Sequence, residues 1–273
     1  MNKSKIVHIF LFVLGCLLAL FYLSPMFILV NNSFKSLKEI YLNVLALPSK
    51  MNFINYTTAL EKLNYGESFI NSLCITVTSV ILLILLSSMA AWVMVRFKTK
   101  ASTMLFMFFT SALLIPFQCV MLPLVRFMDK LGLMNRPGIV FMYIGFGASM
   151  SLLLFHGFIK NIPEELDEAA AIDGANPFQI YYMIILPLLK PIAVTVAILN
   201  TMWIWNDFLL PSLMINKQGW QTLPLKTYSF FGQFSKRWDL ATAGLIMVIL
   251  PVIIFYLICQ KHIVKSITDG AIK

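Results

Sequence analysis

Residues 158–191 read FIKNIPEELDEAAAIDGANPFQIYYMIILPLLKP, an acidic stretch in a chain that is otherwise strongly apolar. Five carboxylates fall within ten residues of this stretch, at Glu164, Glu165, Asp167, Glu168 and Asp173. Ionised carboxylates are costly in hydrocarbon, so these residues must lie outside any membrane. The apolar segments on either side are long enough to cross a bilayer. The acidic stretch therefore decides how the rest of the chain is arranged.

Local signals in this stretch predict two short helices around a glycine turn. Pro163, followed by two glutamates, predicts a helix start with Asn161 as the capping residue. Gly174 predicts that this helix ends in the left-handed conformation. Asn176-Pro177 predicts a second helix start, and Leu186-Pro187 is expected to interrupt the second helix. We name residues 160–190 the acidic hairpin.

The small side chains around the turn permit close approach of another chain. They are Ala169, Ala170, Ala171 and Ala175. This composition suggests a docking surface. A solvated hairpin made of good helix formers is equally consistent with the composition alone.

Composition indicates an integral membrane protein. Of 273 residues, 59% are hydrophobic and 12% are charged, about half the charged fraction of a soluble domain. The net charge of +9 is explained by membrane orientation and anionic lipid contact rather than by nucleic acid binding. No dense aromatic and basic patch indicates a nucleic-acid partner.

The cysteines and histidines indicate neither a disulfide framework nor a metal site. The cysteines lie in apolar runs without C-x-x-C spacing, and the histidines are far apart in the sequence. These residues are Cys16, Cys74, Cys119, Cys259, His8, His156 and His262. No metal site and no catalytic residue is predicted.

Hydropathy predicts an all-α membrane protein with six transmembrane helices in a single domain, residues 1–273. The predicted spans are residues 6–34, 69–95, 104–125, 138–159, 191–215 and 240–260. The first span is too long to be a cleaved signal peptide. Pro116 and Pro123 predict an irregular third span, and residues 35–68 are expected to form a loop with at most one short surface helix.

The fifth span carries polar side chains. Asn200, Trp203 and Asp207 share one helical face, and Asn206 adjoins them. A carboxylate in a span is costly unless it faces protein or water. These four residues are therefore candidates for lining a translocation pathway, with interhelical hydrogen bonding as the alternative.

The chain lacks the sequence G-x-x-x-x-G-K followed by Ser or Thr, so it has no phosphate-binding loop of the P-loop kind. If this chain moves a solute against a gradient, the energy must come from elsewhere.

Several motifs resemble the permease subunits of binding-protein-dependent ABC importers. Glu168-Ala169-Ala170, Gly174, Ile184 and Leu186-Pro187 match the EAA loop of that family at every signature position. Residues 162–175 and the Trp203 to Pro211 segment are similar to its carbohydrate-importer branch, in particular the maltose permease G type of subunit. Ser266 departs from the family pattern, which usually has glycine there.

The resemblance implies the type I ABC importer permease fold, in which the acidic hairpin docks into a separate ATPase. Glu168 would make a charged contact, Gly174 would set the turn, and Ala169 and Ala170 would allow a close fit. Asp173, Ile184, Leu186 and Pro187 complete the coupling site implied by the resemblance.

The resemblance also implies the partners: a second homologous permease, two copies of an ABC ATPase, an extracytoplasmic solute-binding protein and the lipid bilayer. ATP and Mg²⁺ would be used by the ATPase, and no cofactor would be bound by this chain. The expected activity is ATP-driven import of a sugar or oligosaccharide, with no catalysis by this subunit. In this family the external loop, here residues 216–240, can insert into the binding protein.

Charge counts alone do not orient the chain in a bacterial inner or plasma membrane. The tails, the 96–103 loop and the acidic hairpin hold ten Lys and Arg residues, and the other three loops hold eleven. The denser placement of charge at span ends favours cytoplasmic termini and a cytoplasmic acidic hairpin.

Three alternatives remain at this stage. A self-sufficient secondary transporter fits six spans and Asp207 but leaves the acidic hairpin without a role. An importer of a non-sugar solute, such as a polyol phosphate, is a second alternative. An intramembrane serine protease using Ser149 and His156 is disfavoured, because seven residues of helix separate them by about 10 Å along the axis.

Overall fold

The computed structural model describes residues 3–215, 217–232 and 236–271, and within these ranges it describes the side chains of Lys5 and of residues from Val7 to Gln260. This part of the chain is helical and contains no named β-strand, only an isolated bridge between Phe231 and Lys236. Its longer helices are α1 (Lys3–Ser33), α4 (Tyr65–Arg96), α5 (Lys100–Ser111), α6 (Phe117–Lys130), α7 (Arg136–Ile159), α11 (Lys190–Asn206) and α14 (Trp238–Ala271). The short ones are α2 (Leu37–Leu42), α3 (Ile54–Lys62), α8 (Glu165–Ile172), α9 (Pro177–Gln179), α10 (Leu186–Leu188), α12 (Leu209–Met214) and α13 (Leu223–Thr227).

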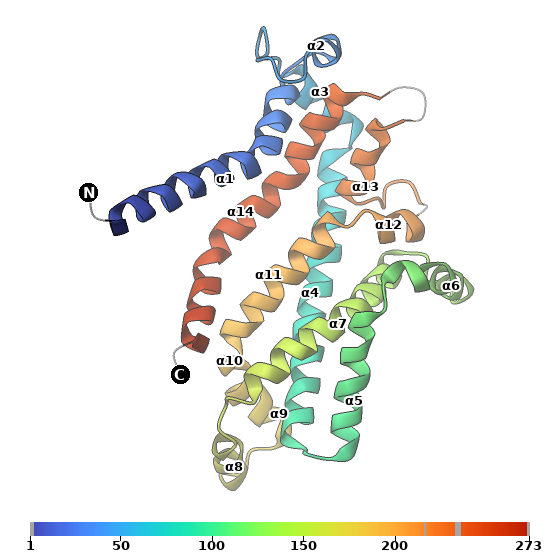
Figure 1. The fold of residues 1–273 in the computed structure, drawn as a ribbon. Coiled ribbons are helices and arrows are strands. Elements are labelled where there is room, and N and C mark those ends of the chain that lie inside the picture. The colour runs from blue at the N-terminus through green and yellow to red at the C-terminus, as the bar shows by residue number, and fades with distance from the viewer. Residues whose placement is uncertain (1–2, 216, 233–235, 272–273) are drawn as a thin grey trace. The chain divides into compact units, whose positions relative to one another are not determined.

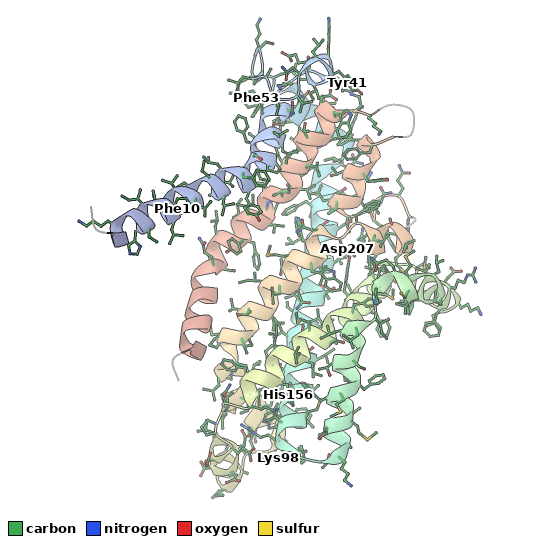
Figure 2. The ribbon with its side chains drawn as sticks, viewed as in Figure 1. Phe10, Tyr41, Phe53, Lys98, His156 and Asp207 are labelled. Carbon is green, nitrogen blue, oxygen red and sulfur yellow. The ribbon has the colours of Figure 1, made fainter. Side chains whose placement is uncertain are left out.

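The chain divides into two compact units. Unit 1 comprises residues 1–65 and 226–250, and unit 2 comprises residues 66–225 and 251–273. Within unit 2, α4, α5, α7 and α11 run alongside one another, with α8 and α9 at one end and α6 and α12 at the other (Figure 1). Figure 2 labels Lys98 and Asp207, which lie toward these two ends.

Four described helices are long and apolar enough to cross a membrane. They are Val7–Ser33, Tyr65–Arg96, Arg136–Ile159 and Trp238–Gln260. Two further pairs of helices pass the same criteria together but are bent, by 105° between Leu114 and Phe117 and by 75° between Leu188 and Lys190. The described residues therefore hold up to six spans, if each bent pair counts as one.

Two of the expected spans differ from straight helices. The third span, residues 104–125, bends just before Phe117, where Pro116 is extended and caps α6, while Pro123 lies within α6. The fifth span, residues 191–215, stops at Asn206 because Asp207 has an extended backbone. The short helix α12, which contains Pro211, follows it.

The segment 35–68 contains more helix than the sequence pattern indicates. Ser36 and Glu39 form a capping box that starts α2, α3 follows, and α4 already begins at Tyr65. The Ser36-x-x-Glu39 spacing is a recognised helix-start signature, so this helix was detectable from the sequence.

Helix α4 packs through a stripe of small and polar side chains. Its buried residues recur every three or four positions, the spacing of one helical face. They include Ser68, Asn71, Ser72, Thr76, Ser79, Leu83, Ser87, Ala91 and Val95. Small and polar residues on one face are typical of helix packing in a membrane, and here they form the buried face of α4.

Unit 2 has two hydrophobic clusters. The hairpin-end cluster includes Val95, Phe155, Ala170, Ile185 and Val196. The opposite cluster includes Leu83, Met128, Met142, Ile204 and Met214.

Unit 1 contains a buried polar core at the end of α1. Lys35 is 1% exposed, and its Nζ donates to the carbonyl oxygens of Asn43 (3.1 Å) and Val44 (3.0 Å). Asn55 donates to the carbonyl oxygens of Ser33 and Lys35, both at 2.8 Å. Burial lowers the pKa of the Lys35 amine, and the charge of Glu39 opposes that shift. These bonds satisfy the backbone where the chain leaves α1.

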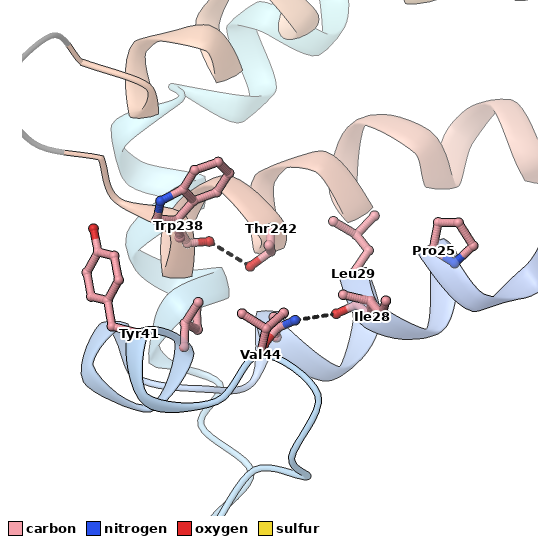
Figure 3. Close-up of a pocket in the computed structure, with 9 residues that line it drawn as sticks. Pro25, Ile28, Leu29, Tyr41, Val44, Trp238 and Thr242 are labelled. Carbon is pink, nitrogen blue, oxygen red and sulfur yellow. Dashed lines mark hydrogen bonds between the residues drawn. The ribbon is translucent and has the colours of Figure 1, made fainter.

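An apolar groove of about 410 Å³ also lies in unit 1 (Figure 3). Pro25, Ile28 and Leu29 of α1 form one side, with Tyr41 and Val44 beyond the end of the helix. Trp238 and Thr242 of α14 complete the wall, and the Thr242 hydroxyl donates to the Trp238 carbonyl oxygen at 2.8 Å.

Candidate functional site: the acidic hairpin and the polar cluster between α7 and α11

The turn of the acidic hairpin is a Schellman motif. Gly174 has φ +85°, and its N–H donates to the carbonyl oxygen of Ala171 at 3.1 Å. The N–H of Ala175 donates to the carbonyl oxygen of Ala170 at 3.0 Å. The expected left-handed helix end at Gly174 is confirmed. No atom lies within 4 Å of a Cβ built on Gly174, so the backbone conformation alone requires glycine here.

The two expected helix starts had different outcomes. Asn176 caps α9 in a capping box with Gln179, as its position predicted. The expected cap at Asn161 is wrong, because α8 starts at Glu165 and Glu164 is its capping position without a side-chain bond. Asn161 lies just beyond the end of α7, and its Nδ2 donates to the carbonyl oxygen of Gly157 at 3.2 Å. The free carbonyl groups of the preceding helix compete for this amide.

The expected interruption at Leu186-Pro187 is also wrong. A π-helix over Ile180–Ile185 runs into α10, which contains Pro187, and the 75° bend comes only between Leu188 and Lys190. Proline removes one donor from the regular helical ladder. The wider π turns just before it change the hydrogen-bond register, so that the helix continues through Pro187.

The inner side of the acidic hairpin is fastened to the end of α4. Asp167 forms an ion pair with Arg96, and their side chains are only 14% and 11% exposed. Trp92 Nε1 donates to the same carboxylate at 3.3 Å, and Arg96 Nη2 donates to the carbonyl oxygen of Ile162 at 3.2 Å. Sequence reasoning missed this attachment. The available signal was that Asp167 and Ala170, three residues apart, share the buried face of α8.

An exposed ion pair lies beside this buried one. Lys98 Nζ and Glu164 Oε1 are 2.7 Å apart, and both side chains are largely exposed. The hydrogen bond from Lys98 and the nearby charges of Lys98 and Arg96 hold the pKa of Glu164 below its usual value.

The outer side of the acidic hairpin has no partner among the described residues. Of the eight expected coupling residues, Glu168, Ala169, Asp173, Gly174 and Pro187 are exposed, Ala170 is buried, and Ile184 and Leu186 are half-buried against the hairpin-end cluster.

Apolar side chains extend this exposed surface. Ile172, Met183 and Phe178 are 86%, 73% and 66% exposed. Sequence reasoning did not select these three residues. A surface that joins carboxylates to exposed apolar side chains has the composition of a protein-binding face.

A polar cluster links α7 and α11 in the opposite half of unit 2. The Tyr143 hydroxyl donates to Asp207 Oδ2 at 2.9 Å, and the Leu209 N–H donates to Oδ1 at 2.9 Å. The rings of Tyr143 and Trp203 meet edge to face with centroids 5.5 Å apart. Asp207 ends α11, and its Oδ1 caps the start of the segment that follows. Tyr143 is a member that sequence reasoning missed.

Asn200 lies apart from this cluster in a fully buried contact. Its Nδ2 donates to Ser151 Oγ at 3.1 Å and to the Val196 carbonyl oxygen at 2.9 Å. A Cβ on Gly147 would lie 2.9 Å from Asn200 Oδ1 and 2.7 Å from Leu83, so glycine is needed for this close helix contact. Asn206 is exposed and bonds only its own helix, at the Met202 carbonyl oxygen. The structure therefore brings together Trp203 and Asp207 but not all four expected pathway residues.

A groove of about 440 Å³ adjoins the cluster. Trp203 forms one part of its wall, Gly145 and Ser149 of α7 another, and the α5 to α6 elbow around Ile115 the rest. The groove joins a mostly apolar wall to a few polar groups, which is the usual character of a small-molecule path.

Residues 83–269, which include both the acidic hairpin and the polar cluster, match the family described as "Binding-protein-dependent transport system inner membrane component". The chain belongs to this family. It is thus the membrane-spanning, non-catalytic permease component of an ABC importer that works with a binding protein.

Named relatives cover the whole permease. It is 49% identical over 273 residues, all of both chains, to the probable starch degradation products transport system permease protein AmyC of Thermoanaerobacterium thermosulfurigenes. It is 37% identical, over 100% of this chain and 99% of the other, to the multiple sugar-binding transport system permease protein MsmG of Streptococcus mutans.

A solved structure supports the fold of the permease. A chain of a bacterial ABC transporter involved in import of the acidic polysaccharide alginate aligns with a TM-score of 0.81 and 24% identity, covering 96% of this chain and 98% of that one. The type I permease fold expected from the acidic hairpin is confirmed.

Proposed function

We propose that this chain is the permease subunit of an ATP-driven importer for a sugar or oligosaccharide in a bacterial plasma membrane. The relatives named for starch degradation products and for multiple sugars support this cargo class. A secondary transporter would need no docking element, and the exposed outer side of the acidic hairpin speaks against it.

The main support for a coupling role is the difference between the two sides of the acidic hairpin. The inner side is held on α4 by Asp167 and Arg96. The outer side offers Glu168, Ile172 and Phe178 to solvent. We infer that an ABC ATPase binds this outer side, with a basic side chain opposite Glu168 and the exposed apolar residues buried on docking. Gly174 keeps the turn tight enough for both helices to reach the ATPase.

The assembly implied by this role contains a second homologous permease, two copies of the ATPase and an extracytoplasmic solute-binding protein. ATP and Mg²⁺ are bound by the ATPase and not by this chain. The acidic hairpin and both termini then face the cytoplasm. Every side chain from Val7 to Phe27 on α1 is exposed, which leaves this helix free for lipid or for the second permease.

The translocation path in this proposal runs along the polar cluster. Trp203 presents its indole ring, a group that binds sugar faces, in the wall of the 440 Å³ groove. Tyr143, which packs against this ring, links it to the Asp207 carboxylate, a group that binds sugar hydroxyls. Asn200 is buried and bonded, so its role is to hold α7 against α11. Asn206 is exposed and bonds the carbonyl oxygen of Met202 in its own helix, and it is assigned no contact with the solute.

Pull-down of the ATPase from detergent extract tests the docking role. Glu168→Ala should weaken recovery of the ATPase, whereas Glu165→Ala, which removes an exposed carboxylate outside the signature, should leave it unchanged. Equal recovery for both variants would mean that Glu168 is only a helix-start charge.

Cargo is tested separately, in proteoliposomes that contain the complete importer and its binding protein. Uptake of labelled maltooligosaccharides should require ATP and the binding protein. Uptake of a polyol phosphate in preference to every sugar offered would overturn the proposed cargo.

A further inference from the structure

A second groove lies between α4 and α7. It has a volume of about 500 Å³. Cys74, Thr78 and Leu82 line it from α4, and Arg136, Val140 and Ile144 line it from α7. The positions are four residues apart on both helices, so the groove follows the two helix axes. Its wall is apolar except at the Arg136 end.

Arg136 has hydrogen-bonding capacity that the protein does not use. Its Nε is buried and has no hydrogen-bond partner among the residues that the structure describes. Its Nη2 donates to the carbonyl oxygen of Gly219 at 3.1 Å, and the guanidinium lies 5.1 Å from the centre of the Trp220 ring. A half-buried guanidinium without a counter-ion is costly, and an anion bound to its accessible N–H groups would reduce that cost.

The charges around Arg136 favour an anion. Lys217 Nζ lies 4.6 Å from the centre of the same Trp220 ring, so two cations meet one indole. The Glu67 carboxylate also borders this loop, 2.8 Å from the position of a Cβ on Gly219. Among the described residues, Arg136 forms no ion pair with Glu67 or with any other carboxylate.

The depth of the groove matches one leaflet of a membrane. Arg136 is the first residue of the span Arg136–Ile159, at the end away from the acidic hairpin. Ile144 lies eight residues further along, about 12 Å at the helical rise, while half of the hydrocarbon layer is about 15 Å. The cationic end therefore lies at the headgroup level, and the apolar part extends into the hydrocarbon of that leaflet.

We propose that the α4–α7 groove binds an anionic phospholipid, with its phosphate at Arg136 and one acyl chain between the two helices. A free phosphate would leave the apolar length of the groove empty. A lipid without net charge would leave the positive charge of Arg136 without a counter-ion. In the orientation proposed above, this lipid comes from the outer leaflet.

Photocrosslinking of the complete transporter tests this site. The complex is reconstituted with phosphatidylglycerol that carries a diazirine in its acyl chain, or with the matching phosphatidylcholine, and labelled peptides are identified by mass spectrometry. Peptides that contain residues 74–82 and 140–144 should be labelled about fivefold more by phosphatidylglycerol, the ratio expected for one basic residue at a membrane surface. Arg136→Gln should reduce labelling to the phosphatidylcholine level, and Arg126→Gln, at an exposed arginine on α6, should not.

A groove-filling variant makes the test independent of Arg136. Thr78→Phe leaves the guanidinium in place and should abolish labelling of both peptides by either lipid. If the transporter does not assemble with Arg136→Gln, the labelling of Thr78→Phe alone tests whether the lipid occupies the groove. Equal labelling by the two lipids, labelling that persists in Thr78→Phe, or a crosslink from Cys74 to the second permease would each overturn the proposal.

Discussion

Two aspartates in unit 2 are buried in opposite ways. Asp167, on the acidic hairpin, meets the fixed positive charge of Arg96 and the indole N–H of Trp92. Asp207, at the far end of α11, meets only neutral donors, the Tyr143 hydroxyl and the Leu209 N–H. The first carboxylate is paired with a cation of the same chain, whereas the described hydrogen-bond partners of the second carry no charge. A carboxylate of the first kind fastens two elements, and one of the second kind can still bind a solute.

Breaking the Asp167–Arg96 pair should have the largest effect. Asp167→Ala leaves a buried guanidinium without its partner, a change that costs about 3–5 kcal/mol. We expect a clear fall in the midpoint of thermal unfolding of the purified complex and faster proteolysis within the acidic hairpin.

The double variant Asp167→Ala with Arg96→Ala is the control for this effect. It should lose less stability than the sum of the two single variants, because no charge is then left unpaired. Strictly additive losses would show that the two side chains do not act as a pair.

Removing the neutral donor to Asp207 should have the next largest effect. Tyr143→Phe deletes a hydrogen bond to a charged group, of the kind worth about 1.5–3 kcal/mol. Transport should fall while recovery of the ATPase in pull-down is unchanged, because the acidic hairpin is untouched. Tyr22→Phe, at an exposed tyrosine on α1, is the matched control. If Tyr143→Phe also reduced recovery of the ATPase, the separate roles given to Asp167 and Asp207 would be wrong.

A substitution in the turn of the acidic hairpin should have a smaller effect on stability than the two changes above. Gly174→Val forces a branched side chain into a left-handed backbone, at a cost of about 1–2 kcal/mol. The outer side of the acidic hairpin should shift while the Asp167 attachment remains. Substrate-stimulated ATP hydrolysis should drop, and ATPase recovery should fall with it. Unchanged stimulated hydrolysis would exclude a coupling role for the turn.

The exposed pair Lys98–Glu164 should have the smallest effect. Because the pKa of Glu164 is lowered in the folded protein, its stabilising contribution is complete above the ordinary value of 4.5 and is lost as the pH falls through the lowered pKa. Glu164→Gln should therefore leave the unfolding midpoint at neutral pH nearly unchanged, since solvent screens exposed pairs. A loss at pH 7 as large as that of Asp167→Ala would contradict the contrast between buried and exposed charge.

Features set by a few neighbouring residues were predictable from the sequence. Gly174 ends α8 and Asn176 starts α9 through bonds within six residues, and the long apolar runs identify the spans. Local chemistry decides such features because no distant group competes for them. At Asn161 the end of α7 did compete, and the expected cap was wrong.

Contacts between distant segments were not predictable in the same way. Arg96 and Asp167 are 71 residues apart, and Tyr143 and Asp207 are 64 apart. Each pair exists only because α4, α7 and α11 pack at a particular register, which depends on small residues such as Gly147. The sequence pattern selected Asp207 because a charge in a span is conspicuous. It passed over Asp167 because four other carboxylates surround it.

Helix α4 is continuous from Tyr65 to Arg96. At one end Arg96 holds the acidic hairpin, and 25 residues away, about 38 Å along the axis, Asn71 donates to the carbonyl oxygens of Gly219 and Gln221. One helix therefore contacts both the acidic hairpin and the 219–221 loop, so a ligand at the hairpin that displaces α4 would change the free energy of binding at that loop. Thermodynamic linkage makes this effect reciprocal. Through this one helix, binding on one side of the membrane would be linked to binding on the other.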